Sequence, residues 1–361
     1  MDDMYSVIVG SGSFIPKKKI HSTDFLNSEF YDSDGTRFEK DNEEIIEKFE
    51  KITEIKVRRY IEDDKVASDI AYYAAKDALE SSGIDKESLD YIIVAHNFGD
   101  VPHGNARTQN VPSLASKVKH KLGIKNYNTI PYDILFGCPG WLQGIIQADK
   151  FIRLGDAKRV LVIGAETISR VSDPHDRDSM IYADGAGATI LEARQSDEPI
   201  GIISSVTRSD TYEFYNLIHM GKSFNPDFED NSLFLKMNGH KLYQYGLKTV
   251  PKVVKESIEK AGLTITDIKK VFIHQANVKM DEAILSRLLR LYKVEKVQEG
   301  IMPMTLPWLG NNSVATIPTL YDLIIKGKLH GAKYKPESGD FVVFCSVGAG
   351  VNINSIVYKF P

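Results

Sequence analysis

Cys138 is the residue of this sequence whose neighbours most favour chemistry. It lies in Gly137-Cys138-Pro139, between a strand-like run at 130–135 and an apolar stretch at 141–154. Proline suits the first position of a helix, so the thiol is expected at a helix N-terminus, where the helix dipole and free N–H groups favour the thiolate. The pattern predicts a sulfur nucleophile. The alternative is a small buried hydrophobic side chain, the usual fate of a free cysteine.

Two further polar residues and one turn could complete such a site. His274 follows the apolar run 271–273, at the end of a strand where sites in α/β sheets tend to lie. Asn311 follows a glycine, and a helix cap is the favoured explanation when it is taken alone. The small residues of 346–351 predict a turn whose backbone N–H groups can approach a ligand. Since these residues are far apart in sequence, only the fold can bring them together.

The elements that would position these residues follow an α/β pattern. Short β-branched runs alternate with segments of helical period, which predicts a mainly parallel sheet covered by helices. Apolar residues recur at helical spacing in 66–78 and 243–258, and Gly83 and Gly262 follow as expected left-handed caps. The predicted strands are 5–9, 91–95, 160–164, 188–192, 200–206, 271–274, 341–345 and 352–358.

The order of these elements repeats in the two parts of the chain. In each part a helix ending at glycine precedes a strand, a polar turn with its helix, and a second strand. The repeat predicts two related halves, 1–195 and 196–361, with a site at their junction.

Composition excludes several classes of protein. With 361 residues, 45 basic and 49 acidic side chains and a net charge of −4, the chain is a globular protein without the charge of a nucleic-acid binder. Two distant cysteines argue against a disulfide framework. The start lacks the pattern of a secretory signal, and no apolar run approaches the roughly 18 residues of a membrane helix. We therefore expect a cytoplasmic protein that does not contact membranes.

Three segments break the regular pattern. Residues 28–65 are highly charged, and a solvated excursion with a surface helix is the simplest interpretation. Residues 207–235 read as a long loop of the kind that covers sites. The acids and histidine of 173–178 could suggest a metal, but consecutive residues do not guarantee converging ligands, so we predict a loop held by Asp/Arg pairs and no metal.

Taken together, the motifs resemble the 3-oxoacyl-[acyl-carrier-protein] synthase III family of thiolase-like condensing enzymes. The resemblance covers nearly the whole chain and implies a duplicated, layered α-β-α-β-α fold. The matching segments, in chain order, are Gly137-Cys138-Pro139-Gly140-Trp141, Asp184-Gly185-Ala186-Gly187-Ala188, Met237-Asn238-Gly239, His274-Gln275-Ala276-Asn277, Gly310-Asn311-Asn312-Ser313 and Gly348-Ala349-Gly350.

The resemblance implies a catalytic triad of Cys138, His274 and Asn311. Cys138 would accept an acyl group from an acyl thioester, typically acyl-CoA, and the backbone N–H groups of Cys138 and Ala349 would form the oxyanion hole. His274 and Asn311 would donate hydrogen bonds to the thioester oxygen of malonyl-[acyl carrier protein] as it loses CO₂. The resulting carbanion equivalent would attack acyl-Cys138 in fatty acid biosynthesis, with no cofactor.

The resemblance also implies partners. Lys279 matches a basic family position that helps to hold the carrier or CoA phosphate, beside Asn277, and Arg287 and Arg290 could extend a basic patch towards an acidic acyl carrier protein. A solvated helix face explains the patch equally well. Lys252 and Lys255 on the adjoining helix belong to the same patch. Family members are usually homodimers, so a homodimer is expected.

Several features depart from the family pattern. The tryptophan-and-arginine segment that grips the CoA adenine should fall at 45–60, where no tryptophan occurs and only Arg58 and Arg59 resemble its end. The segment 96–110 is longer than usual in a region that in the family contributes to the acyl pocket and the dimer contact, so the starter acyl group could be unusual.

Three alternatives remain beside the main prediction. A hydroxymethylglutaryl-CoA synthase needs a glutamate where this chain has His96-Asn97-Phe98, which counts against it. A specialised condensing enzyme of secondary-metabolite or lipid biosynthesis would use the same triad. A non-catalytic, acyl-binding partner subunit commonly loses a triad member, whereas all three are present here.

Overall fold

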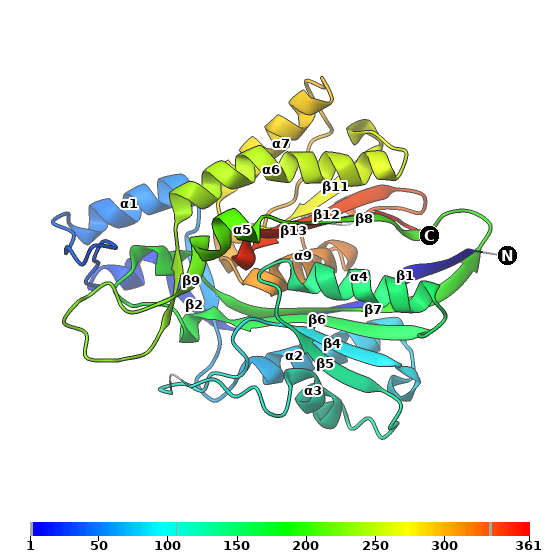
Figure 1. The fold of residues 1–361 in the computed structure, drawn as a ribbon, viewed down its shortest axis with the longest axis horizontal. Helices are drawn as coiled ribbons and strands as arrows, with labels where there is room; N and C mark the ends of the chain where they lie inside the picture. The colour runs from blue at the N-terminus through cyan, green and yellow to red at the C-terminus, as the bar shows by residue number, and fades with distance from the viewer. Residues whose placement is uncertain (1–2, 106, 332–333) are drawn as a thin grey trace.

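The computed structural model describes residues 3–105, 107–331 and 334–361, and two main β-sheets dominate it (Figure 1). The first sheet has the strand order β1-β7-β6-β4-β5 and the second β11-β12-β13-β8. The strands of the first are β1 (Asp3–Phe14), β4 (Tyr91–Ala95), β5 (Ile130–Ile134), β6 (Arg159–Thr167) and β7 (Asp184–Ser196). The strands of the second are β8 (Gly201–Ser209), β11 (Ile268–Ile273), β12 (Phe341–Gly348) and β13 (Asn352–Lys359). Each of the eight predicted strands lies in one of these sheets.

Both sheets are mixed, so the prediction of a mainly parallel arrangement is wrong. β4 pairs in parallel with β5 and β6, and β11 with β12, but β7 runs antiparallel to β1 and β6, and β13 to β12 and β8. A parallel pair needs a crossover connection. β12 and β13 are joined by the short turn 349–351, and such a turn permits only antiparallel pairing.

Helices form three layers around these sheets, which gives the expected α-β-α-β-α architecture (Figure 1). The outer layers are α2 (Ala67–Ser82) with α3 (Leu114–Leu122), and α6 (Gly239–Lys260) with α7 (Val278–Leu291). Between the sheets lie α4 (Gly140–Arg153) and α9 (Thr316–Ile325), in a core that both sheets share. None of the helices within the described residues is long and apolar enough to cross a bilayer.

The inner face of α2 is built from alanines, which let it approach β1 closely. Ala74 and Ala78 are fully buried, and a Cβ atom on Gly12 of β1 would lie 2.3 Å from the Ala74 carbonyl oxygen. Any side chain at Gly12 would therefore push the helix away from the sheet. Gly83 ends α2 with φ +67°, as the sequence predicts.

The charged segment 28–65 differs from its predicted solvated form because one face of it is buried. Its helix α1 (Asn42–Thr53) packs Ile45, Ile46 and Phe49 into a core cluster with Val278 of α7. Ile52 of the same helix, in contrast, is 43% exposed. The short elements beside α1 are β2 (Lys18–His21), β3 (Val57–Tyr60) and α8 (Leu306–Leu309).

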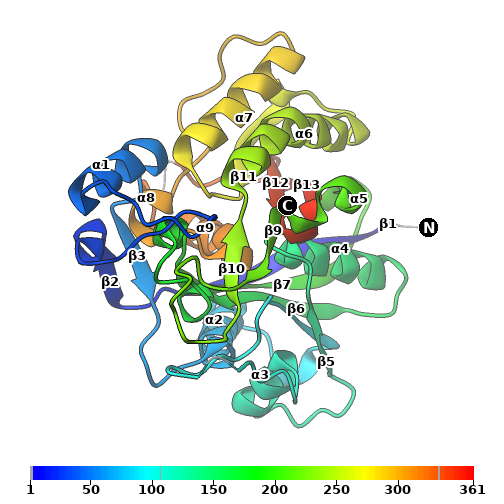
Figure 2. The same cartoon turned by 60° about the vertical axis from the view of Figure 1, so that its left-hand side comes forward.

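The predicted loop 207–235 contains regular structure. After α5 (Thr211–Phe214), the strands β9 (Ile218–Gly221) and β10 (Phe234–Met237) pair as an antiparallel hairpin. Figure 2 shows this hairpin and α1 on the same side of the sheets. The 173–178 loop contains the predicted kind of Asp/Arg pair, Arg177 Nε to Asp178 Oδ1 at 3.8 Å. The buried Lys236 of β10, which was not predicted, pairs with Asp173 and Asp176 of the same loop.

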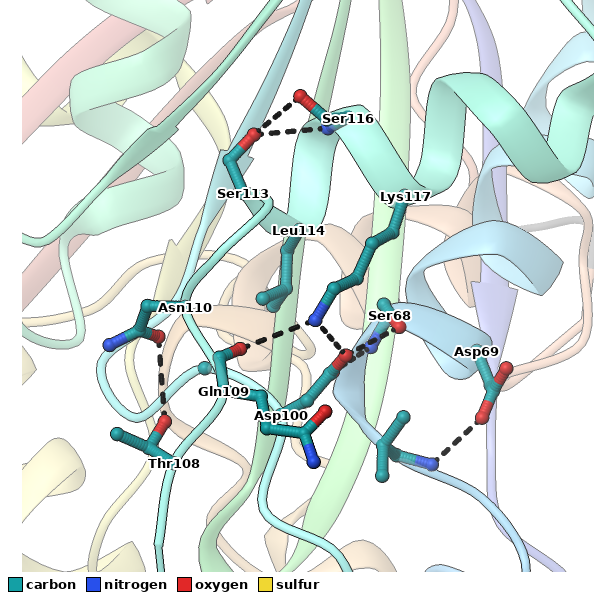
Figure 3. Close-up of polar contacts among 12 residues, drawn as sticks. Ser68, Asp69, Asp100, Thr108, Gln109, Asn110, Ser113, Leu114, Ser116 and Lys117 are labelled. Carbon is teal, nitrogen blue, oxygen red and sulfur yellow. Dashed lines mark hydrogen bonds and ion pairs between the residues drawn. The ribbon is translucent and has the colours of Figure 1, made fainter.

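Asp100 and Lys117 hold the long segment after β4 against α2 and α3 (Figure 3). One oxygen of this buried carboxylate accepts a hydrogen bond from the Ser68 backbone N–H at 2.7 Å. The other accepts from the Ser68 hydroxyl and from Lys117 Nζ, both at 2.8 Å. Lys117 Nζ also donates to the Gln109 carbonyl at 3.3 Å. These bonds hold the chain at Asp100, three residues after Asn97, whose side chain belongs to the candidate site.

Candidate active site

Cys138 lies in a tight turn between β5 and α4. Gly137 adopts φ +63°, and Pro139 is the N-terminal cap of α4, one residue before the predicted position. A Cβ atom on Gly137 would lie 2.6 Å from Ala349 N, and one on Gly348 would lie 2.3 Å from Cys138 N. Only glycines allow the cysteine turn and the closing turn to meet this closely, Gly137 against Ala349 and Gly348 against Cys138.

His274 follows β11 and is held by its backbone. Its N–H donates to the Cys345 carbonyl at 2.8 Å, and its side chain is 7% exposed. The ring atom Nδ1 has no hydrogen-bond partner among the described residues. Burial lowers the pKa of His274 to about 4, so the imidazole is neutral at pH 7.

Asn311 is fixed through both its backbone and its side chain. Its N–H donates to the Ile181 carbonyl at 2.9 Å, and its carbonyl accepts from Ala183 at 2.8 Å. Its Oδ1 atom accepts a hydrogen bond from the Ser313 N–H at 2.9 Å. This bond occupies the amide oxygen and leaves the NH₂ group as a donor for a ligand.

These residues share one cavity of about 1510 Å³. Cys138 and Ala349 line it from the meeting turns, and His274 and Asn311 line it from the second half of the chain. Apolar residues of α1, α6 and α7 form much of the remaining wall, with the β9–β10 hairpin beside them. The structure thus brings together a thiol, a neutral imidazole and a carboxamide, as the sequence predicts.

The predicted carrier-binding residues lie mostly outside this cavity. Asn277 lines it and caps α7 by accepting a hydrogen bond from Met280 N at 3.1 Å. Lys279, Arg287 and Arg290 are exposed on α7 and are not among the lining residues, and Arg287 Nη1 donates to the Leu247 carbonyl at 3.1 Å.

Arg58 and Arg59, which resemble the end of the family segment that binds the CoA adenine, also do not line the cavity. Arg58 is fully buried, and its Nε donates to the Met180 carbonyl at 2.9 Å. The Arg59 guanidinium lies over the ring of Trp308, 5.9 Å from its centroid. Both have structural partners instead.

A polar chain behind the cysteine was not predicted from the sequence. The Ser313 hydroxyl donates to Cys138 Sγ at 3.3 Å, and Asn97 Nδ2 donates to Ser313 Oγ at 3.3 Å. Asn97 Nδ2 also donates to Glu166 Oε2 at 2.7 Å. Asn97 and Ser313 adjoin motifs that are visible in the sequence, but no spacing rule links them to Glu166 on β6.

The prediction that the helix N-terminus lowers the pKa of the Cys138 thiol is wrong. Burial raises the pKa of Cys138 to about 11, the Ser313 hydrogen bond lowers it in part, and the nearby Glu166 raises it further. Desolvation therefore outweighs the helix N-terminus in the substrate-free protein.

We expect Ser313→Ala to slow alkylation of Cys138 by iodoacetamide roughly three- to tenfold at pH 8. The variant removes a hydrogen bond that stabilises the thiolate, which is the form of Cys138 that reacts. The backbone N–H that holds Asn311 is retained. Peptide mass spectrometry measures the rate at Cys138. Ser346→Ala is the matched control, since Ser346 also lines the cavity but its hydroxyl has no partner among the described residues. Equal rates in both variants would contradict the role of Ser313.

Glu166 predicts a pH-dependent stability. Burial raises its pKa to about 7, against the opposing effects of His96 and Asn97. The folded protein then binds this proton more tightly than the unfolded chain, so the free energy of unfolding contributed by Glu166 falls as pH rises from about 4.5 to about 7. Between these two pH values, the free energy of unfolding of Glu166→Gln should rise by roughly 3 kcal/mol relative to that of the wild type.

Urea denaturation at a series of pH values measures this difference. Exposed Glu198→Gln is the control and should follow the wild type. A Glu166→Gln profile parallel to the wild type would show that folding does not raise the pKa of Glu166.

Comparison with known proteins identifies the family of this chain. Residues 132–211 match the family model of 3-oxoacyl-[acyl-carrier-protein (ACP)] synthase III, and residues 258–360 match the model of its C-terminal part. Together these matches cover just over half of the chain.

Solved structures agree over almost the full length. The 3-oxoacyl-[acyl-carrier-protein] synthase III of Aquifex aeolicus VF5 is 26% identical, with a TM-score of 0.79 over 98% of this chain and 100% of that one. The corresponding enzyme of Thermus thermophilus is 27% identical, with a TM-score of 0.80 over 98% and 99%. The priming β-ketosynthase of the R1128 polyketide biosynthetic pathway is 25% identical, with a TM-score of 0.80 over 100% and 97%. The chain belongs to the 3-oxoacyl-[acyl-carrier-protein] synthase III family and is an acyltransferase of the condensing type.

Proposed function

We propose that the protein condenses an acyl thioester, with acyl-CoA as the starter, with malonyl-[acyl carrier protein] through an acyl-cysteine intermediate in fatty acid biosynthesis. The observation that carries the proposal is the shared cavity of Cys138, His274 and Asn311. In the first step Cys138 Sγ bonds to the acyl carbon, the C–S bond to CoA breaks, and CoA leaves as a thiol with the cysteine proton. The N–H groups of Cys138 and Ala349 stabilise the oxyanion.

In the second step malonyl-[acyl carrier protein] loses CO₂. The electron pair of the broken C–C bond is held as an enolate, whose oxygen receives hydrogen bonds from His274 and Asn311. The enolate carbon then bonds to the acyl carbon, and the bond to Cys138 Sγ breaks to release the 3-oxoacyl product. The electron pair of this bond stays on Cys138 Sγ as a thiolate, which takes up a proton from water to restore the thiol. A neutral His274 suits this role because it donates one hydrogen bond without bringing a full charge into a buried site.

Intact-protein mass spectrometry tests the first step. Incubation with a series of acyl-CoA and acyl-carrier donors should give an adduct of one acyl group on Cys138. The donor that reacts fastest identifies the starter. A non-catalytic, acyl-binding subunit would give no covalent adduct with any donor.

A specialised condensing enzyme is the second candidate function. The similarity to the R1128 priming β-ketosynthase favours it, because that protein belongs to a polyketide pathway and is as similar as the fatty acid enzymes. Product analysis after condensation with the preferred starter distinguishes the two candidates.

We further propose that Lys279, with Arg287 and Arg290, attracts the acidic acyl carrier protein to the exposed face of α7. Lys279→Glu should lower kcat/KM for malonyl-[acyl carrier protein] on the order of tenfold at low salt, and less at high salt. Lys125→Glu, an exposed lysine on the connection after α3, is the charge-matched control. Loss of kcat/KM that is equal in both variants, or that salt does not change, would rule out this docking surface.

We also propose a homodimer, as is usual for the family. Size-exclusion chromatography with light scattering measures the mass directly, and a monomer at micromolar concentration would contradict this proposal.

A further inference from the structure

A buried carboxyl group in the wall of the cavity has no partner within the protein. Asp281 of α7 is 2% exposed and lines the cavity. Its side chain makes no hydrogen bond or ion pair with any described residue, and its Oδ2 atom is fully enclosed. Buried carboxyl groups are normally hydrogen-bonded or paired, because their desolvation is unfavourable. An unpartnered one in a substrate cavity points to a ligand.

The position of Asp281 in α7 does not explain it. Its place in the first turn could suggest a capping role, but Asn277 performs that role through Met280 N. Val278, one helical turn before Asp281 on the same face, packs with Ile45 and Phe49 of α1. The carboxyl group therefore lies on the side of α7 that faces α1. The α1 residues that line the cavity are partly apolar and partly polar: Ile45, Phe49 and Ile52, with Glu44, Lys48 and Thr53.

The chemical form of this group defines what it can bind. Burial raises the pKa of Asp281 well above its ordinary value, with the neighbouring Glu282 acting in the same direction. Both effects favour the protonated acid, which offers one O–H donor and one carbonyl acceptor. Amides and hydroxyls present the complementary donor and acceptor.

We propose that Asp281 binds an amide or hydroxyl group carried by the thioester substrate and selects substrates that place such a group beside α1. This inference rests on the proposed function, since it takes the cavity to hold an acyl thioester. Two sources supply the chemistry: an amide of the pantetheine arm, which CoA and carrier protein share, or a hydroxyl on the acyl chain.

Two variants with the same branched side-chain shape separate hydrogen bonding from packing. Asp281→Asn keeps a neutral donor and acceptor, whereas Asp281→Leu keeps the branched shape and removes both. Asp281→Leu should be at least as stable as the wild type to heat, because it replaces an unpartnered buried polar group. A loss of activity in this variant would then not reflect a damaged fold.

The rate of Cys138 acylation is measured with three donors of equal chain length: an unbranched acyl-CoA, a hydroxyacyl-CoA, and a simple alkyl thioester without amides. We expect Asp281→Leu to be slower by about tenfold or more with a donor that carries the recognised group, and Asp281→Asn to remain within about twofold. A slower acylation of Asp281→Leu with both CoA esters, but not with the alkyl thioester, would show that Asp281 binds an amide of the pantetheine arm. A loss with the hydroxyacyl-CoA alone assigns the acyl hydroxyl.

Three results would overturn the inference. These are wild-type rates of Asp281→Leu with both CoA esters, an equal loss with the alkyl thioester, or an equal loss in Asp281→Asn. The failure of the proposed function is distinguishable, because the wild type itself would then acquire no acyl group from any donor.

Discussion

Cys138→Ala should abolish formation of the acyl-enzyme and lower overall condensation on the order of a thousandfold or more, because no other group can form the covalent intermediate. Intact-protein mass spectrometry should find no adduct with a donor that fully acylates the wild type. Alanine at position 138 should keep the turn intact, because the close contact between Gly137 and Ala349 is made by backbone atoms of Ala349 and does not involve the cysteine sulfur.

The second cysteine provides the matched control. Cys345 is also among the cavity-lining residues, but it is fully buried on β12, and burial raises its pKa to about 12. Cys345→Ala should therefore acquire the acyl group as the wild type does. An adduct that persists in Cys138→Ala and disappears in Cys345→Ala would show that the nucleophile has been assigned to the wrong residue.

Asn311→Ala should leave acylation of Cys138 largely intact and block decarboxylative condensation. The removed NH₂ group is needed only when negative charge develops on the malonyl thioester oxygen, so the effect belongs to the second step. Loss of one such donor typically lowers the rate roughly 100- to 1,000-fold. Adduct mass reports the first step, and release of CO₂ with formation of the 3-oxoacyl product reports the second.

Asn311→Asp refines this experiment. The aspartate keeps an oxygen that accepts the hydrogen bond from Ser313 N at 2.9 Å in the wild type, but it lacks the NH₂ donor. It should thus preserve the local backbone and still fail in condensation. Condensation at the wild-type rate in Asn311→Ala would remove Asn311 from the second step.

The sequence alone determined the parts of this protein that depend on local patterns. Short apolar, β-branched runs predicted eight strands, and each of them is a strand in the structure. Gly83 and Gly262 were predicted as left-handed helix ends, and both have positive φ. The turn around Cys138 was predicted from its glycines and proline because such turns are encoded by adjacent residues. His274 and Asn311 carried little signal individually and became informative only through the family resemblance.

Tertiary structure decided what depends on the surroundings of each group. Desolvation by distant elements raises the pKa of Cys138, although the local helix N-terminus predicts the opposite shift. Residues from three separate segments form the polar chain from Glu166 through Asn97 to Ser313. Asp281 is buried in the cavity wall without a hydrogen-bond partner among the described residues, which no local pattern indicates. A local pattern specifies which elements form, whereas burial and long-range contacts arise only when those elements pack together.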